Sequence, residues 1–164
     1  MRILGIDPGL ATVGWGVIDV IKGKPKAVAY GVISTSKDLK LPQRLCVIEE
    51  DLKTLIDKFK PDEIALEELF FNNNVTTGIN VSHARGVILL TATKYCGKLF
   101  EYTPLQIKQA LTGYGRAEKR QIQEMTKTLL CLQKIPKPDD AADALAVALT
   151  HSQTSNLSGV FSVK

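Results

Sequence analysis

The sequence predicts an α/β fold built on a mixed five-stranded sheet, three antiparallel strands followed by two parallel ones, with helices on both faces. Three observations predict it: apolar runs bounded by turns near the start, long segments with apolar residues at helical spacing, and short apolar runs that alternate with those segments. At 164 residues and 45% hydrophobic, the chain can bury one core. We expect one domain over residues 1–151 and a flexible tail over 152–164.

The first three expected strands form an antiparallel meander. Arg2 to Asp7 is an apolar run ended by Pro8-Gly9, and Val13 to Val20 alternates large residues with small or polar ones. Lys26 to Ser34 follows after a Gly23-Lys24-Pro25 turn. Short connections of this kind join antiparallel neighbours.

A strand, helix and strand unit comes next. Between Leu41 and Phe59 the apolar residues fall on one face at helical spacing, with charged residues opposite. After Pro61, Glu63 to Glu67 is a short apolar run suited to a strand buried between two layers. A crossover helix of this kind implies parallel pairing with a right-handed connection.

The rest of the chain is mainly helical. Thr103 is a favourable N-cap, and Pro104 suits the first position of a helix. We expect helices over residues 75–95, 104–111, 118–132 and 139–151, and a fifth strand over residues 99–102.

Composition excludes several classes of protein. No stretch approaches the roughly 18 uninterrupted apolar residues of a membrane span, and Met1 to Asp7 lacks the pattern of a signal peptide. Three widely spaced cysteines fit neither a zinc knuckle nor a disulfide framework. We therefore expect a cytoplasmic protein. The net charge of +4 does not by itself separate a nucleic-acid partner from ordinary solubility.

Acidic residues fall at the ends of predicted elements. Asp7 closes the first strand and Glu67 the fourth, so they can meet at the edge where strands of an open α/β sheet end. Asp140 and Asp143 lie on one face at the start of the last helix, where several alanines let that helix approach the sheet closely. Strand alternation points Glu68 away from Glu67.

Four carboxylates at one place require a compensating cation. Oxygen ligands without histidine or cysteine favour Mg²⁺, or Mn²⁺, over zinc. Two such ions roughly 3.5 to 4 Å apart can support phosphodiester hydrolysis, and cancelling four acids would move the net charge from +4 to about +8. Each acid also has a structural interpretation: Asp7 as a turn residue, and Asp140 with Asp143 as a capping box.

Six segments, taken together, resemble the RuvC family of Holliday junction resolvases over residues 1–151. They are Leu4-Gly5-Ile6-Asp7-Pro8-Gly9, Ala65-Leu66-Glu67 with Phe70, His83-Ala84-Arg85-Gly86, Phe100-Glu101-Tyr102, Gly115-Arg116-Ala117-Glu118-Lys119 and Asp140-Ala141-Ala142-Asp143-Ala144-Leu145-Ala146.

The resemblance implies an RNase H-like fold and a homodimeric, metal-dependent endonuclease. It implies paired symmetric nicks in four-way DNA junctions that leave 5′-phosphate and 3′-hydroxyl ends, and work alongside the branch-migration proteins RuvA and RuvB. On this resemblance the metal ligands are Asp7, Glu67, Asp140 and Asp143.

DNA contacts are expected at one aromatic residue and at one basic cluster. Phe70 follows the expected strand that ends at Glu67, and by resemblance it matches a family aromatic that unstacks bases. The basic residues around the Gly113-Tyr114-Gly115 turn are otherwise typical of a solvated helix face; Lys108 and Lys119 match family DNA contacts. The expected cluster consists of Lys108, Arg116, Lys119 and Arg120.

A ridge of small residues, Gly78, Ser82 and Gly86, suits close approach of another backbone. By resemblance this ridge lies at the dimer interface, although close packing on the chain's own sheet explains the same spacing.

Three other functions fit parts of the pattern. An actin-like phosphotransferase also places an aspartate before a glycine turn, but it needs two lobes and this chain has the length of one. A non-catalytic junction-binding module does not need the complete set of acids. A related RNase H-like nuclease acting on another structured nucleic acid fits the acids equally well.

Overall fold

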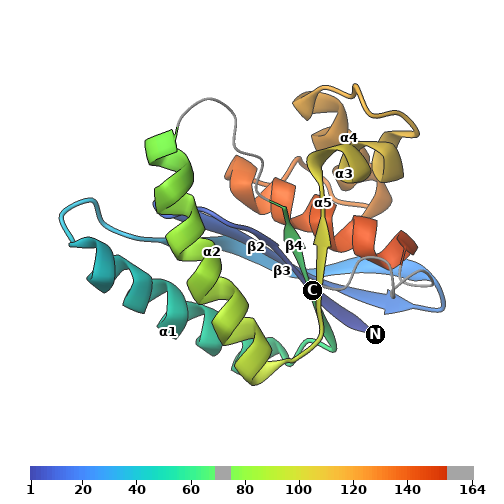
Figure 1. Ribbon diagram of the computed structural model, residues 1–164. Coiled ribbons are helices and arrows are strands. Elements are labelled where there is room, and N and C mark those ends of the chain that lie inside the picture. The colour runs from blue at the N-terminus through green and yellow to red at the C-terminus, as the bar shows by residue number, and fades with distance from the viewer. Residues whose placement is uncertain (69–74, 155–164) are drawn as a thin grey trace.

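The computed structural model describes residues 1–68 and 75–154, the side chains of the second range from Gly78 onward. It has the predicted mixed sheet, in the strand order β3-β2-β1-β4-β5 (Figure 1). The elements are β1 Arg2–Asp7, β2 Thr12–Ile21, β3 Lys24–Ser34, α1 Leu41–Phe59, β4 Glu63–Glu67, α2 Val75–Tyr95, β5 Leu99–Tyr102, α3 Pro104–Thr112, α4 Lys119–Leu129 and α5 Asp139–Thr154.

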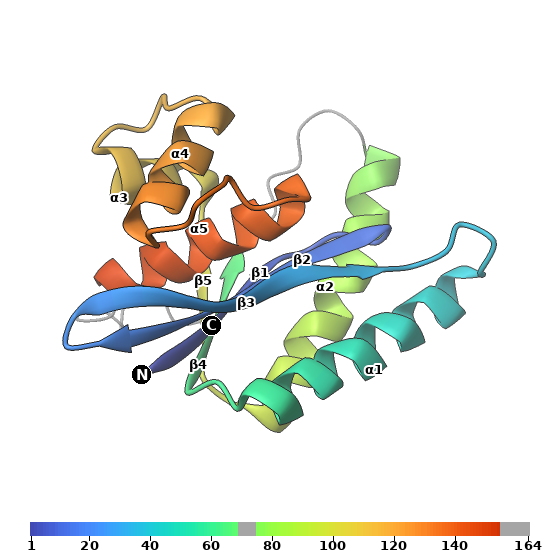
Figure 2. The same ribbon diagram turned by 180° about the vertical axis from the view of Figure 1, so that it is seen from behind.

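The sheet separates two helical layers. Strands β1, β2 and β3 pair antiparallel, whereas β4 pairs parallel with both β1 and β5. Helices α1 and α2 cover one face, and α5 covers the other with α3 and α4 outside it (Figure 2). None of the helices in the described ranges is long and apolar enough to cross a membrane.

Alternation along the strands decides which residues face which layer. In β1, Leu4 and Ile6 enter the core beneath α1 and α2, whereas Ile3 enters the core beneath α5. In β4, Ile64 and Leu66 likewise face α1 and α2. The odd-numbered positions of β1 and β4, which include the last residue of each strand, therefore face α5.

Helix α5 lies in backbone contact with the sheet. A methyl group added at Gly5 would lie 2.1 Å from the carbonyl oxygen of Ala144, and one added at Gly14 would lie 2.0 Å from that of Asp140. The buried face of α5 is rich in alanine, so the small residues predicted to permit this approach do so. Gly5 in β1 and Gly14 in β2 are therefore required because α5 leaves no room for a side chain at either position.

Several boundaries differ from expectation by one to three residues. Helix α4 ends at Leu129 instead of the expected Leu132, and the chain has left helical geometry by Cys131, whose φ is 52°. The β2–β3 turn is made by Lys22 and Gly23, both at positive φ (50° and 76°), which is a two-residue turn that matches strand twist. It lies earlier than the predicted turn at residues 23–25. Helix α5 continues to Thr154, beyond the expected end at His151, and residues 155–164 of the expected tail lie outside the described residues.

Candidate active site

Asp7 and Glu67 are neighbours across two parallel strands. Ile6 lies opposite Leu66 in the β1–β4 register, so the next residue of each strand is an acid. Both acids occupy positions that face α5, at the carboxyl end of their strands. Glu68, the following residue, is exposed, as strand alternation predicts.

The other two acids come from the start of α5. Asp140 is in its first turn and Asp143 follows on the same face. Gly14 pairs with Asp7 across β1 and β2 and lies against the backbone of Asp140, so it holds the start of α5 beside the end of β1. We call Asp7, Glu67, Asp140 and Asp143 the carboxylate cluster.

Burial and mutual repulsion disfavour ionisation in this cluster. Burial, followed by repulsion from Glu67, Asp143 and Asp140, raises the pKa of Asp7 to about 8. Burial and then repulsion from Asp143 raise the pKa of Glu67 to about 7. The four side chains therefore share one electrostatic environment, although they come from three separate elements.

Lys119, the first residue of α4, supplies positive charge to the cluster. Its ammonium nitrogen lies 2.9 Å from Oδ2 of Asp143 and 3.8 Å from Oδ2 of Asp139. The pKa of Asp143 is nevertheless raised, because burial outweighs the hydrogen bond from Lys119. Asp139 itself is the first residue of α5 and pairs with Lys137 at 2.7 Å. Its side chain is 46% exposed.

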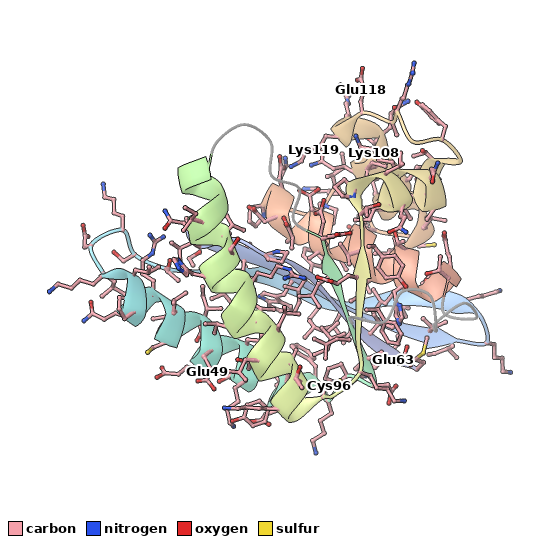
Figure 3. The ribbon with its side chains drawn as sticks, viewed as in Figure 1. Glu49, Glu63, Cys96, Lys108, Glu118 and Lys119 are labelled. Carbon is pink, nitrogen blue, oxygen red and sulfur yellow. The ribbon has the colours of Figure 1, made fainter. Side chains whose placement is uncertain are left out.

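A pocket of about 210 Å³ opens beside the cluster. Glu67, Asp143, Lys108 and Lys119 supply its polar lining, and its remaining wall is apolar: Pro104, Ile107, Ile122 and Ala146. Lys108 and Lys119 lie near each other at the end of the sheet where β4 finishes, whereas Glu63 lies toward the other end (Figure 3). Both lysines lower the pKa of Glu67.

The donor set fits hard divalent cations. All four side chains of the cluster offer carboxylate oxygens. Burial first, and repulsion between the acids second, raise the pKa of Asp7 and Glu67, and a bound cation would relieve that repulsion. No three acidic, histidine or cysteine side chains of residues 1–68 and 78–154 are grouped as ligands of one ion. Binding an ion would thus require the carboxylates to close inward.

The two arginines predicted to bind DNA do not lie in the carboxylate cluster. Arg116 and Arg120 are exposed beside Tyr114 in a shallow cleft at the α3–α4 turn, outside the carboxylate cluster. Glu118 and Glu124 also line that cleft, so its charge is mixed. Phe70 lies outside the described residues.

The ridge predicted for dimerisation lies on α2. Gly86 is exposed, and a methyl group added there would meet nothing within 4 Å. Packing against the chain's own sheet therefore does not explain this glycine. Ser82 donates a hydrogen bond to the carbonyl oxygen of Gly78, within the helix.

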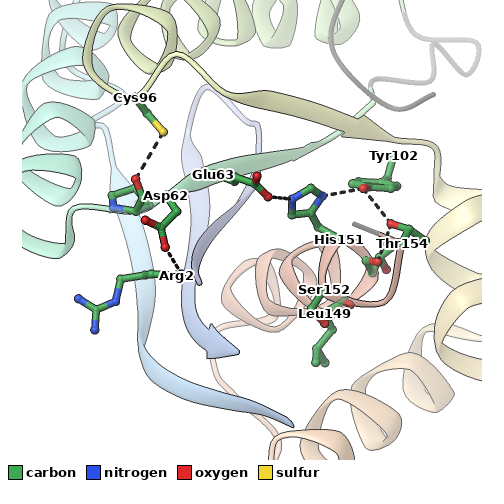
Figure 4. Close-up of polar contacts among 11 residues, drawn as sticks. Arg2, Asp62, Glu63, Cys96, Tyr102, Leu149, His151, Ser152 and Thr154 are labelled. Atoms are coloured by element: carbon green, nitrogen blue, oxygen red, sulfur yellow. Dashed lines mark hydrogen bonds and ion pairs between the residues drawn. The ribbon is translucent and has the colours of Figure 1, made fainter. Parts of the chain in front are cut away.

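A buried polar network beneath α5 was missed by sequence reasoning. His151 is fully buried, with Nε2 2.7 Å from a carboxylate oxygen of Glu63 and Nδ1 2.7 Å from the hydroxyl of Tyr102 (Figure 4). The Thr154 hydroxyl lies 2.9 Å from that of Tyr102. Strand alternation in β4 could have indicated this network, because it places Glu63 on the same face of the sheet as Glu67.

Comparison with known proteins gives a consistent result. The family model described as "Crossover junction endodeoxyribonuclease RuvC" matches residues 3–151. Proteins of that name from Alkaliphilus oremlandii (strain OhILAs) and Finegoldia magna (strain ATCC 29328 / DSM 20472 / WAL 2508) are similar. The first is 52% identical over 164 residues, covering 100% of both chains. The second is 57% identical over 151 residues, covering 92% of each.

One solved structure is similar over nearly the whole chain. It is T. thermophilus RuvC in complex with a Holliday junction substrate, with a TM-score of 0.93 and 32% identity, and 99% of each chain is covered.

Proposed function

The chain belongs to the crossover junction endodeoxyribonuclease RuvC family, and from that premise we propose that the carboxylate cluster is the centre at which it cuts four-way DNA junctions. The proposed products are paired nicks with 5′-phosphate and 3′-hydroxyl ends. The observation that carries the assignment is the convergence of four acids from β1, β4 and α5 in one environment, where burial and repulsion raise the pKa of Asp7 and Glu67.

The cluster would hold Mg²⁺, with Mn²⁺ as an alternative and two ions per site. When bound, such ions activate water and stabilise the leaving oxygen of a phosphodiester. The protein's own contribution is to keep four carboxylates together on rigid elements. Gly14 supports this role, because a side chain at that position would push Asp140 away from Asp7.

Basic residues around the pocket would position the DNA backbone. Lys108 and Lys119 line the pocket next to Glu67 and Asp143, so a phosphate drawn to the lysines would lie beside the acids. Arg116 and Arg120 would contact phosphates further along the strand. Phe70, outside the described residues, follows β4 closely enough in sequence to stack on a base near the same site.

A twofold dimer would present two such centres to two strands of the junction. The exposed face of α2 supports this arrangement, because Ile79 and Leu90 are 52% and 55% exposed on either side of exposed Gly86. From family membership alone we propose RuvA and RuvB as partners and the cytoplasm as the compartment.

The decisive experiment compares a synthetic four-way junction with linear duplex of the same sequence in the presence of Mg²⁺. We expect symmetric nicks in the junction and almost none in the duplex. Equal cutting of both would favour an RNase H-like nuclease of other specificity. Tight junction binding without any cutting would indicate a binding module and would contradict the proposed catalytic centre.

A further inference from the structure

We propose that Lys119 is an exchangeable counter-ion: in the absence of DNA its ammonium group competes with divalent cations for Asp143, and a DNA phosphate draws it away. The proposal rests on the proposed function, because it takes the carboxylate cluster as the metal site. It adds a coupling between DNA binding and metal binding, and it assigns that coupling to one side chain.

The contacts of Lys119 are those of a cation held by the cluster. Its nitrogen is hydrogen-bonded to Oδ2 of Asp143 at 2.9 Å, and Asp139 is 3.8 Å away. It also interacts electrostatically with Asp7 and Glu67, the last residues of β1 and β4. A single ammonium thus acts on residues from β1, β4 and α5.

The position of Lys119 along its own helix does not explain this placement. Lys119 is the first residue of α4 and follows the N-cap Glu118. The N-terminus of a helix carries partial positive charge, which disfavours a lysine there. The ion pair with Asp143 offsets this unfavourable position of a positive charge.

Lys119 is also free to leave. Its side chain is 56% exposed, whereas that of Asp143 is 25% exposed. A lysine ammonium is a mobile point charge on a flexible stem, so it can exchange one oxygen partner for another at small cost. Phosphate oxygens entering the pocket would offer such partners, because Lys119 lines that pocket.

The exchange has a thermodynamic consequence. While Lys119 is paired with Asp143, a divalent cation must displace it, which weakens metal binding. A phosphate that takes Lys119 releases Asp143 for the metal, and by reciprocity the metal favours DNA binding. Metal would then be held tightly mainly when the DNA backbone is in place.

Lys108 offers a matched comparison. It lines the same pocket and lowers the pKa of Glu67, as Lys119 does. It forms no ion pair with the described residues. If general positive charge were the only effect, removing either lysine would change metal affinity alike. If Lys119 competes directly with the metal for Asp143, only removal of Lys119 should change metal affinity strongly.

The test measures the affinity of the full-length protein for Mn²⁺ without DNA. The concentration of free Mn²⁺ during the titration is read from its electron paramagnetic resonance signal. Lys119→Met should tighten Mn²⁺ binding by about 5- to 10-fold, and Lys108→Met by less than about 2-fold. Lys119→Arg should restore weak binding, because it keeps the charge. Circular dichroism checks that each variant is folded.

A second measurement tests the coupling. Fluorescence anisotropy measures junction affinity with and without Ca²⁺, an ion that carboxylate oxygens bind. Gel electrophoresis confirms that the junction stays intact during the measurement. Ca²⁺ should tighten junction binding of the wild type more than that of Lys119→Met. Equal tightening in both proteins would overturn the proposed coupling.

Asp143→Asn separates the two proposals. If it leaves Mn²⁺ binding unchanged, the carboxylate cluster is not the metal site and the proposed function fails. If it weakens Mn²⁺ binding while Lys119→Met has no effect, the metal site stands and the counter-ion proposal alone is overturned.

Discussion

The imidazole of His151, near the end of α5, lies 2.7 Å through Nε2 from a carboxylate oxygen of Glu63, the first residue of β4. Its other nitrogen contacts the hydroxyl of Tyr102 at 2.7 Å. The same helix carries Asp143 about 12 Å away along its axis, at about 1.5 Å per residue. The contact between His151 and Glu63 therefore joins one end of α5 to the sheet whose other end bears the acids.

This contact predicts a pH dependence of stability. Burial lowers the pKa of His151 below 6.5, against the opposing effect of Glu63. Below pH 6.5 the unfolded chain takes up a proton that the folded protein resists, so this stability is present above pH 6.5 and is lost as pH falls.

His151→Gln should remove that dependence. In urea unfolding at fixed protein concentration, the stability advantage of the wild type over His151→Gln should shrink below pH 6.5, by at most about 1.4 kcal/mol per pH unit. Parallel stability curves for the two proteins between pH 5 and 8 would contradict the interpretation.

The carboxylate cluster predicts a pH dependence of stability with the opposite sign, in which stability is lost as pH rises. Because the pKa of Asp7 is raised from 3.8 to about 8, this carboxyl costs stability progressively as pH rises from about 4, and the cost is complete once pH has passed about 8. Asp7→Asn should therefore stabilise the metal-free protein above pH 8, by on the order of 2 kcal/mol. Saturating Mg²⁺ should cancel this gain, because it stabilises only a protein that binds it.

The matched control for this prediction is Asp51→Asn, at an exposed position of α1. It should change stability by less than about 0.5 kcal/mol at any pH. Destabilisation of the metal-free protein by Asp7→Asn would show that the Asp7 carboxylate has favourable partners instead of repulsive ones.

The close approach of α5 to β2 predicts a loss of activity from a single methyl group. In Gly14→Ala the new carbon would lie 2.0 Å from the carbonyl oxygen of Asp140, so the start of α5 must move. We expect junction cleavage to fall at least about 100-fold, as small misplacements of catalytic groups do. Lys24→Ala, at an exposed position of the β2–β3 hairpin away from the site, is the control. Unchanged cleavage by Gly14→Ala would show that the site tolerates the shift.

Sequence reasoning succeeded where local patterns decide the structure. The order of strands and helices follows from apolar periodicity, and the N-cap at Thr103 from its side chain, which accepts a hydrogen bond from the backbone of Gln106. The proximity of Asp7 and Glu67 follows from parallel pairing, which places the carboxyl ends of β1 and β4 together.

What sequence reasoning could not supply depends on contacts between distant segments. Lys119 was expected to contact DNA alone, and nothing in its local sequence indicates a hydrogen bond to Asp143, 24 positions away. The partnership of Glu63 with His151 spans 88 positions and depends on the length of α5. The hairpin turn at Lys22 was missed because positive φ at a lysine is unfavourable and only the strand register imposes it.

The exposed face of α2 predicts which substitutions would disrupt the proposed dimer. Ile79→Glu or Leu90→Glu should convert the protein to monomers in analytical ultracentrifugation, because each buries a charge in an apolar contact. Ile21→Glu is the control, since Ile21 is 61% exposed on the hairpin at another part of the surface. A dimer that survives both α2 substitutions, or that dissociates equally with Ile21→Glu, would place the interface elsewhere.

The basic residues beside the pocket predict a specific change in the salt dependence of junction binding. Each phosphate contact contributes a slope of about 0.9 to the fall of log K with log salt. Lys108→Ala should therefore reduce the slope by about that amount, because Lys108 lines the pocket beside the acids. Arg116→Ala should reduce it equally if the exposed α3–α4 turn follows the DNA backbone. Lys24→Ala, exposed at the hairpin away from the end where β1 and β4 finish, should leave the slope unchanged. A slope that falls for Lys108→Ala but not for Arg116→Ala would confine the DNA path to the pocket and exclude the α3–α4 turn from it.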